Sequence, residues 1–83
     1  MYKLRISPKA GKGLKRLKID HQKAVLEALG EISEDPFIGK PLTRELTGRF
    51  SLRVGVYRII YTVDKTDGII SILTTGHRSV VYN

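Results

Sequence analysis

Three side chains in the C-terminal part of the sequence could take part in phosphate chemistry: Arg58, Arg78 and Tyr82. A planar guanidinium binds two phosphate oxygens at once, and its charge is most effective as negative charge develops on a phosphate under attack. A tyrosine, with a reference pKa of about 10, acts as a base near neutral pH only where cations favour the phenolate. Arg58 and Arg78 could provide that field for Tyr82 if the fold brings them together. Such a set has the parts needed for attack of a ribose 2′-hydroxyl on the adjacent phosphate without a metal ion.

Each of these side chains also has a purely structural interpretation. An arginine in the middle of a strand, such as Arg58, often only pairs with a carboxylate, and Arg53 could do the same with Glu45 or Asp35. His77 follows a glycine, which is typical of a turn. The other tyrosines lie in apolar alternation and are expected to pack in the core: Tyr2, Tyr57 and Tyr61.

Length and composition exclude several classes of site. A chain of 83 residues buries only about 60% of its unfolded surface, so any site is expected on the surface or in a shallow cleft. The absence of cysteine excludes disulfides, thiolate catalysis and zinc sites built on Cys. The two histidines lack metal-ligand spacing, so we expect no metal and no cofactor. No apolar run approaches the roughly 20 residues of a membrane span, and the N-terminus lacks a signal-peptide pattern, so we expect a cytoplasmic protein without membrane contact.

The net charge of +7 is concentrated at one end of the chain. Residues 1–18 contain no acidic residue and the following basic ones: Lys3, Arg5, Lys9, Lys12, Lys15, Arg16 and Lys18. Concentrated positive charge favours polyanions, which are either nucleic acid or an acidic protein segment. The alternative interpretation is a solvated basic helix face that keeps a small protein soluble.

A strand and a first helix are predicted at the N-terminus. Residues 2–6 alternate apolar and basic side chains, as in a half-buried strand. Ser7 is expected to cap a helix that begins at Pro8. One face of this helix is basic and another is apolar: Lys9, Lys12 and Arg16 on the first, and Ala10, Leu14 and Leu17 on the second.

A second helix is predicted with Asp20 as its cap and an end near Glu34. Asp35-Pro36 ends it, because a residue before proline is pushed out of the α region. Only Lys18 and Ile19 separate the two helices, so they are expected to form a hairpin. The segment 37–46 is predicted to be an extended loop.

The rest of the chain has the period of two that is typical of strands. Strands are predicted over residues 50–54, 57–63 and 69–75, with a turn at 64–68, and Gly76-His77-Arg78 is expected to leave the last strand. The predicted fold is α+β and forms a single domain over residues 1–83: an N-terminal strand, a helical hairpin and a three-stranded antiparallel meander that completes the sheet. If the apolar residues of 50–54 face the helices, then Arg49, Ser51 and Arg53 point away from them and are candidates for a site.

The sequence resembles the RelE/ParE toxin superfamily in three places: the run Leu52–Tyr61 (LRVGVYRIIY), Gly76-His77-Arg78, and Val81-Tyr82. Ser7-Pro8 after the first strand, Asp35-Pro36 and the segment 42–48 match further features, so the resemblance covers nearly the whole chain. It implies the toxin of a type II toxin–antitoxin pair.

The superfamily holds two activities. RelE-like members are mRNA interferases that cut codons in the ribosomal A site, whereas ParE-like members poison DNA gyrase and lack the catalytic arginines and the terminal tyrosine. The resemblance gives Arg58 the role of stabilising the phosphate in the transition state, Arg78 that of general acid and Tyr82 that of base. These three residues favour the RelE-like activity.

The sequence also departs from the RelE-like pattern. RelE-like toxins commonly carry lysines at the positions that hold Arg49 and Ser51 here; Arg49 keeps the charge and Ser51 loses it. The spacing from Arg78 to Tyr82 is shorter than in the best-known pattern. His77 is therefore an alternative candidate for part of the acid or base role.

The resemblance, together with these residues, implies a ribosome-dependent endoribonuclease that cleaves translated mRNA, acting as the toxin of a toxin–antitoxin pair. The catalytic candidates are Arg58, Arg78, Tyr82, Arg49 and His77, and the candidates for binding RNA or the ribosome are Lys9, Lys12, Lys15, Arg16 and Arg53. The expected partners are the cognate antitoxin, the ribosome and mRNA. Two alternatives stay open: a ParE-like inhibitor of DNA gyrase, and a catalytically inactive module that binds RNA or an antitoxin.

Overall fold

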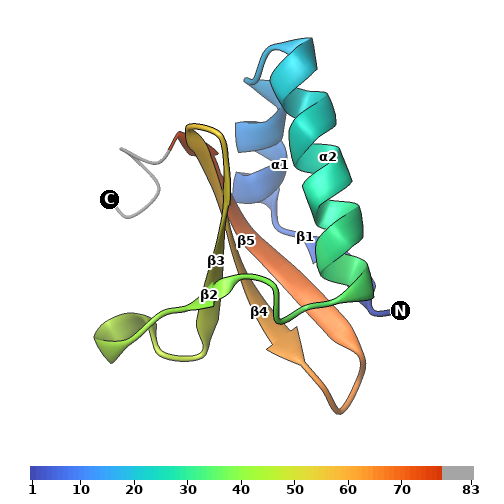
Figure 1. Ribbon diagram of the computed structural model, residues 1–83, viewed down its shortest axis with the longest axis vertical. Coiled ribbons are helices and arrows are strands. Elements are labelled where there is room, and N and C mark those ends of the chain that lie inside the picture. Colours follow the sequence, from blue (N-terminus) through green and yellow to red (C-terminus); the bar gives the residue numbers. More distant parts are fainter. Residues whose placement is uncertain (78–83) are drawn as a thin grey trace.

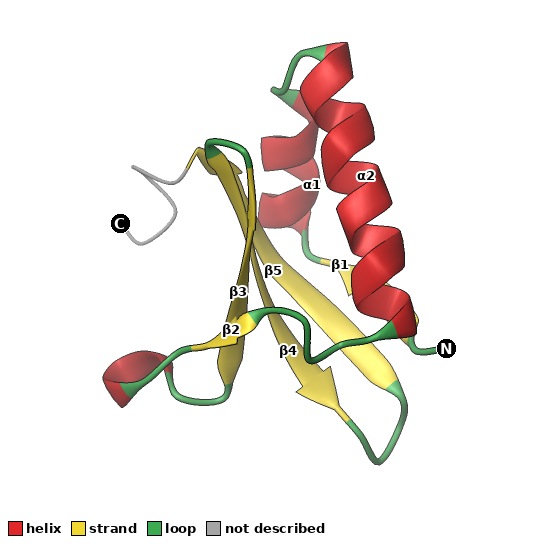
Figure 2. Ribbon diagram, in the orientation of Figure 1, coloured by secondary structure: helices red, strands yellow, loops and turns green. Residues whose placement is uncertain are grey.

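A computed structural model describes residues 1–77 and has a five-stranded sheet with two helices on one side of it (Figure 1). The elements are β1 (Lys3–Ile6), α1 (Pro8–Lys15), α2 (Ile19–Glu34), β2 (Lys40–Pro41), the short 3₁₀ helix η1 (Arg44–Leu46), β3 (Arg49–Val54), β4 (Tyr57–Asp64) and β5 (Ile69–His77). The strand order is β1-β5-β4-β3-β2, in which β1 is parallel to β5 and the other neighbours are antiparallel. The predicted α+β class, helical hairpin and meander are confirmed (Figure 2).

Helix α1 begins as the sequence predicts. The Ser7 hydroxyl accepts a hydrogen bond from the Ala10 N–H at 3.0 Å and donates one to the Leu73 carbonyl at 2.8 Å, which ties the start of the helix to β5. Gly13 lies so close to Thr75 that any side chain at position 13 would overlap the Thr75 carbonyl. The Thr75 hydroxyl donates to the Ala10 carbonyl at 2.7 Å. Glycines weaken α1, and these contacts hold it in place. They hold it beside the C-terminal part of β5, which does not pair with β1.

Helix α2 begins earlier than predicted, because Lys18 and not Asp20 is its N-cap residue. Lys18 makes no side-chain capping bond, and Asp20 lies in the first turn, where its negative charge still suits the positive end of the helix dipole. The Gln22 side chain donates to the Leu14 carbonyl at 3.0 Å and so closes the hairpin between α1 and α2. The predicted end of the helix at Glu34 is confirmed.

The core lies between the sheet and the helices. Its buried residues come from both helices and from strands β4 and β5: Ala10, Val25, Ala28, Leu29, Ile32, Ile59, Tyr61, Ile70 and Ile72. Phe50 of β3 pairs with Tyr61 of β4, so alternate residues of β3 face the helices as predicted. Arg49, Ser51 and Arg53 then lie on the opposite face, which we call the outer face of the sheet.

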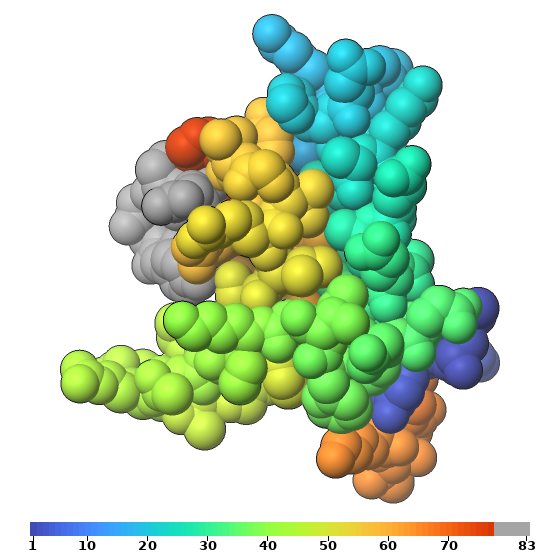
Figure 3. All heavy atoms as spheres, viewed as in Figure 1, coloured from blue at the N-terminus to red at the C-terminus, as the bar shows by residue number. Residues whose placement is uncertain are grey.

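The segment 37–46 is not the extended loop that the sequence predicts. It contains β2, which adds a fifth strand at the sheet edge, and η1, and it projects from the body of the molecule (Figure 3, green to yellow-green). The hydroxyl of buried Tyr61 donates to the Pro36 carbonyl at 2.8 Å and accepts the Gly39 N–H at 3.0 Å. The prediction is wrong because these hydrogen bonds and the β2–β3 pairing join residues that are distant in the sequence.

Strand β5 also continues further than predicted. It includes Gly76 and His77, which pair with Arg58 and Tyr57 of β4, instead of ending at Thr75. The register between β4 and β5 is irregular between Ile60 and Tyr61. Residues 74–76 of this strand lie next to α1.

Candidate active site

The outer face of the sheet carries a pair of directly opposed arginines. Arg53 of β3 and Arg58 of β4 are partners in the antiparallel register, so their side chains leave the sheet on the same face. Like charges in directly opposed positions destabilise a sheet. An anionic group bound between the two guanidinium groups would offset that repulsion.

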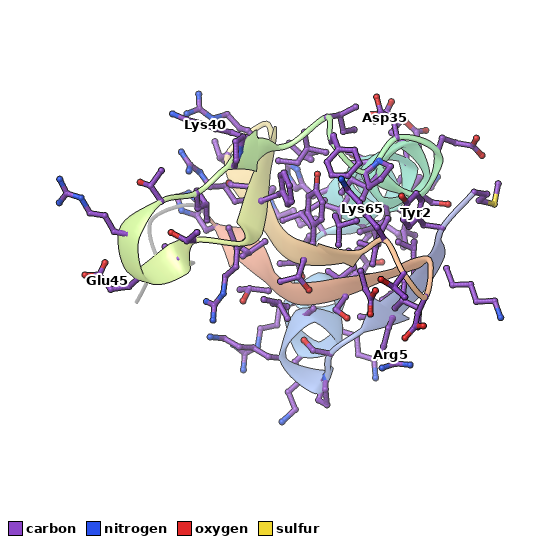
Figure 4. All side chains as sticks on the ribbon, turned by 90° about the horizontal axis from the view of Figure 1, so that it is seen from below. Tyr2, Arg5, Asp35, Lys40, Glu45 and Lys65 are labelled. Atoms are coloured by element: carbon purple, nitrogen blue, oxygen red, sulfur yellow. The ribbon has the colours of Figure 1, made fainter. Side chains whose placement is uncertain are left out.

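A groove of about 350 Å³ lies over these arginines, and we call it the β2–β4 groove. It is lined by Ile38, Lys40, Ser51, Leu52, Arg53 and Arg58. Arg58 is half-buried and its Nε atom is shielded from solvent, whereas Arg53 is exposed. Lys40 extends from β2 on the side of the molecule away from α2 and from Asp35 (Figure 4). The described lining of this groove therefore contains three cations and no acidic side chain.

A second groove, of about 360 Å³, lies between α1 and β5, and we call it the α1–β5 groove. It is lined by Lys9, Lys12, Gly13, Arg16, Thr74, Thr75 and Gly76. The three cations that were expected to share one face of the first helix do so, while Lys15 is exposed outside this lining. Thr74 pairs with Ile60 and Gly76 with Arg58, so this groove borders the same outer face as the β2–β4 groove.

His77, the alternative acid or base, lies on the other face of the sheet from Arg58. It pairs with Tyr57, whose side chain points toward the helices, opposite to that of its neighbour Arg58. The Tyr57 ring makes edge-to-face contacts with both histidines, with ring centroids 4.9 Å from His21 and 6.1 Å from His77. The structure therefore brings His77 into an aromatic cluster on the helix side and not to the opposed arginines.

The other catalytic candidates are placed differently. Arg49 is exposed on the outer face opposite Thr62, but it lies about 13 Å along the extended β3 strand from Arg53. Arg78 and Tyr82 lie outside the described residues. Within residues 1–77, no three side chains of His, Cys, Asp or Glu are grouped to hold a metal ion, and no helix is long and apolar enough to cross a membrane.

Tyr61 is not a candidate for the base. Burial raises the pKa of its hydroxyl above the ordinary value. The hydrogen bond from Gly39 lowers this pKa and the charge of Asp35 raises it, but burial is the largest effect. The hydroxyl is therefore protonated near neutral pH, which it must be to donate to Pro36. Its role is to hold the segment that leads into β2.

Comparison with known proteins identifies the family. The family described as ParE toxin of type II toxin-antitoxin system, parDE, matches residues 4–82. The chain belongs to this family of the RelE/ParE toxin superfamily. Toxin RelG of Mycobacterium tuberculosis is 40% identical over 83 residues, which are 98% of this chain and 95% of RelG. Toxin RelE of the same organism is 32% identical over 83 residues, which are 98% of this chain and 86% of that toxin.

Solved structures agree with this assignment to the RelE/ParE toxins. A chain of the RelBE2 toxin–antitoxin complex of M. tuberculosis is 40% identical with a TM-score of 0.85, covering 93% of this chain and 98% of that one. A chain of the archaeal RelE–RelB complex from Pyrococcus horikoshii is 28% identical with a TM-score of 0.79, covering 96% and 98%. The isolated E. coli RelE toxin, at 23% identity and a TM-score of 0.80 over 99% and 92%, supports the fold alone.

The family description and the individual relatives carry different toxin names. The matching family is named for ParE, whereas both curated relatives above carry Rel names. This RelE/ParE toxin is thus a type II toxin close to RelE-type toxins, and the resemblance drawn from its sequence is confirmed. The family name alone does not decide between cleavage of RNA and inhibition of gyrase.

Sequence reasoning missed two contributions to the grooves of this RelE/ParE toxin. Lys40 falls in the segment that is predicted as a loop, so no partner strand is assigned to it. Gly76 lines the α1–β5 groove, together with Thr74 and Thr75, because β5 continues beyond its predicted end at Thr75. A period-two pattern extended through residues 74–77 would have been a signal for the second, but no local pattern indicates the pairing of Lys40.

Proposed function

We propose that this chain is the ribosome-dependent endoribonuclease of a type II toxin–antitoxin pair and cuts translated mRNA. The observation that carries the proposal is the opposed pair of Arg53 and Arg58 on the outer face, in a groove whose described lining has no acidic residue. Such a site suits a phosphodiester. The likeness to toxins that carry Rel names supports the same activity.

In the proposed reaction the ribose 2′-oxygen forms a bond to the adjacent phosphorus as the bond from phosphorus to the 5′-oxygen breaks. The products are a 2′,3′-cyclic phosphate and a 5′-hydroxyl end. Arg58, whose Nε is buried, would stabilise the charge on the five-coordinate phosphorus, because a guanidinium is most effective where water is excluded. From the resemblance we assign the proton of the 2′-hydroxyl to Tyr82 and the proton given to the leaving 5′-oxygen to Arg78.

Dependence on the ribosome is proposed because both grooves are open and shallow. An open surface cannot by itself hold a flexible RNA in the in-line geometry that the reaction needs, so a partner that presents the message would supply much of the rate. The basic residues of α1 would then contact ribosomal RNA: Lys9, Lys12, Lys15 and Arg16. Action on translated mRNA would place the toxin in the cytoplasm.

The decisive experiment is primer extension on an actively translated message after expression of the chain. We expect cuts phased with the codons, and we expect the same cuts from purified toxin on programmed ribosomes in the presence of a chelator that leaves the ribosome intact. Cuts on free RNA that depend on an added metal ion would contradict the proposed mechanism. The absence of any codon-phased cut would contradict the activity.

A second candidate function is inhibition of DNA gyrase, and the ParE name of the matching family favours it. This function needs no RNA chemistry, so a catalytically inactive binding surface would suffice. DNA-cleavage complexes that form with gyrase, together with intact mRNA, would establish this candidate. Failure of both assays would leave a module that binds RNA or an antitoxin without catalysis.

We also propose an antitoxin as the partner of this chain. Solved relatives are toxin–antitoxin complexes, including RelBE2 and the archaeal RelE–RelB complex. Several large apolar side chains are exposed on the free chain: Leu4, Ile6, Ile19, Leu26 and Phe37. A partner that covers such surface should raise the melting temperature by binding linkage. Co-expression with the product of an adjacent gene tests this, and no complex and no rise in melting temperature would contradict it.

A further inference from the structure

The edge strand β2 places Lys40 on the same face as the opposed arginines. Lys40 and Ser51 are partners in the antiparallel pairing of β2 with β3, and Ser51 lies on the outer face. Directly opposed side chains have Cβ atoms about 4.5–5.5 Å apart, and diagonal neighbours are about 7–8 Å apart. Arg53 is the diagonal neighbour of Lys40, which is within the reach of two long side chains. Lys40 therefore belongs to the same surface as Arg53 and Arg58.

The described lining of this groove is strongly cationic. Lys40 and Arg53 are both exposed and line the same groove as the half-buried Arg58, and the described lining contains no acidic residue. Each added cation raises the repulsion that an empty groove must tolerate, and each one strengthens the binding of an anion. A set of three cations around a hydroxyl residue is thus suited to a phosphate group or to the backbone of a nucleic acid.

The position of Lys40 is set from the core. The residue before it, Gly39, is bound through its N–H to the buried Tyr61 hydroxyl at 3.0 Å, and the same hydroxyl donates to Pro36 at 2.8 Å. A side chain at Gly39 would approach the Tyr61 oxygen within 2.5 Å, so only glycine permits this hydrogen bond without movement. One hydroxyl therefore fixes both ends of the short segment between α2 and β2.

We propose that Lys40 is a third phosphate-binding residue of the β2–β4 groove, beside Arg53 and Arg58, and that the Tyr61 hydroxyl is a positioning residue for it. The ligand class is the phosphodiester backbone of single-stranded RNA, so the proposal rests on the proposed function. A cation on β2 extends the binding surface from the opposed arginines to the sheet edge.

The test measures binding without cleavage and without the ribosome. The probe is a short single-stranded RNA with 2′-O-methyl groups, which keeps every phosphate and removes the attacking hydroxyl. Lys40→Ala should weaken binding about fivefold to tenfold at low salt and reduce the slope of log Kd against log salt by about 0.7, the loss of one phosphate contact. Lys40→Arg should stay within about twofold of wild type, because it keeps the charge. Lys23→Ala, on the exposed side of α2, is the matched control and should not change binding.

A double-mutant cycle tests the positioning role of Tyr61. Tyr61→Phe should weaken RNA binding about threefold in the wild-type background and should have no effect when Lys40 is already alanine. A merely structural role for the hydroxyl would lower stability equally in both backgrounds and leave binding unchanged. Equal weakening of binding by Tyr61→Phe in the two backgrounds would overturn the positioning role.

The outcomes separate this proposal from the proposed function. Binding that depends on Lys40, in a chain that makes no codon-phased cuts, would retain the phosphate site and overturn the ribonuclease. If the chain makes codon-phased cuts but Lys40→Ala binds the RNA probe as tightly as Lys23→Ala does, the phosphate site alone is overturned. No binding of the probe by the wild-type chain at low salt would also overturn it.

Discussion

The two grooves are similar in volume and in number of cations, but they are built in different ways. The α1–β5 groove takes all three of its cations from one helix and its end, with Lys9 and Lys12 in α1 and Arg16 as the C-cap residue. The β2–β4 groove takes one cation from each of three strands, and one of them, Arg58, is partly buried. Exposed charges on a helix are screened by salt and add mainly to affinity, whereas a partly buried guanidinium acts in a lower dielectric. The difference suggests that one groove docks the substrate and the other acts on it.

Among the described residues, the largest effect is expected at Arg58. Arg58→Ala should lower the single-turnover rate of cleavage on programmed ribosomes by about 10² or more, as for other losses of a positioned charge in the transition state. The affinity for ribosomes should barely change, because the charges of α1 remain. Arg5→Ala, an exposed arginine on β1, is the control and should be close to wild type. If Arg58→Ala cleaves within about threefold of the wild-type rate, the β2–β4 groove is not the groove that acts on the substrate.

Reversal of the α1 charges should change the affinity for ribosomes more than the rate of cleavage. Replacing Lys9, Lys12 and Arg16 with Glu should weaken ribosome association and reduce the magnitude of its salt slope by about 2–3, because three phosphate contacts are lost. The rate at saturating ribosome should change far less than the affinity. Salt titrations of ribosome binding measure this, with reversal of exposed Lys3, Arg5 and Lys23 as a control of equal charge. Unchanged binding at every salt concentration would return α1 to the role of a solvated basic face.

The same contrast explains what the sequence could predict. The α1 cations share a face because of the helical period, which is a local property, and that prediction holds. The outward direction of Arg53 also follows from a local period of two and holds as well, and Arg58, its partner on β4, leaves the sheet on the same face. Their direct opposition depends on the length of the turn between β3 and β4, which the sequence also localises.

The predictions that fail are those that depend on distant contacts. The segment 37–46 has no apolar period of its own, and β2 forms because β3 provides a partner and Tyr61 a hydrogen-bonding hydroxyl. No local pattern therefore marks Lys40 as a site residue, although the sequence alone shows that Ser51 lacks the charge of the RelE-like pattern. Helix α2 starts before Asp20 because tertiary contacts at the hairpin outweigh the preference for a capping side chain.

The packing of α1 against β5 can be tested with two glycines of the same helix. Gly13→Ala should destabilise the protein by about 1–3 kcal/mol, because the added methyl group overlaps the Thr75 carbonyl. Gly11→Ala meets open space and should stabilise it by up to about 1 kcal/mol through helix propensity. Urea unfolding measures both changes. Equal effects of the two substitutions would mean that α1 is not held in place by this contact.

On the β2 side, the Tyr61 hydroxyl holds the segment before β2 in place. Because Tyr61 can ionise, its contribution to stability depends on pH. Tyr61→Phe should cost about 1–3 kcal/mol near pH 8, because the Gly39 N–H and the Pro36 carbonyl lose a buried partner. Burial raises the pKa of Tyr61 in the folded chain, so the unfolded chain releases this proton first as the pH rises. The stability that the residue contributes is thus complete below about pH 10 and is lost above it. Urea unfolding from pH 8 to 11 should give a smaller alkaline loss for the Phe variant, and an equal loss would contradict the assignment.

The smallest effect is expected at His77, which lies on neither groove. His77 faces the helices and contacts Tyr57, on the opposite side of the sheet from Arg58, so His77→Ala should change the single-turnover rate by no more than about threefold. Tyr82→Phe, by contrast, should lower it by roughly 10² to 10⁴ if the resemblance assigns the base correctly. Both rates are measured on the same programmed ribosomes, at saturating concentration so that binding does not contribute. A severe loss for His77→Ala with a normal rate for Tyr82→Phe would mean that the helix-side cluster opens during the reaction and that His77, not Tyr82, takes the proton. In that case the chemistry would take place at the end of β5, between the two faces of the sheet, and the β2–β4 groove would only bind.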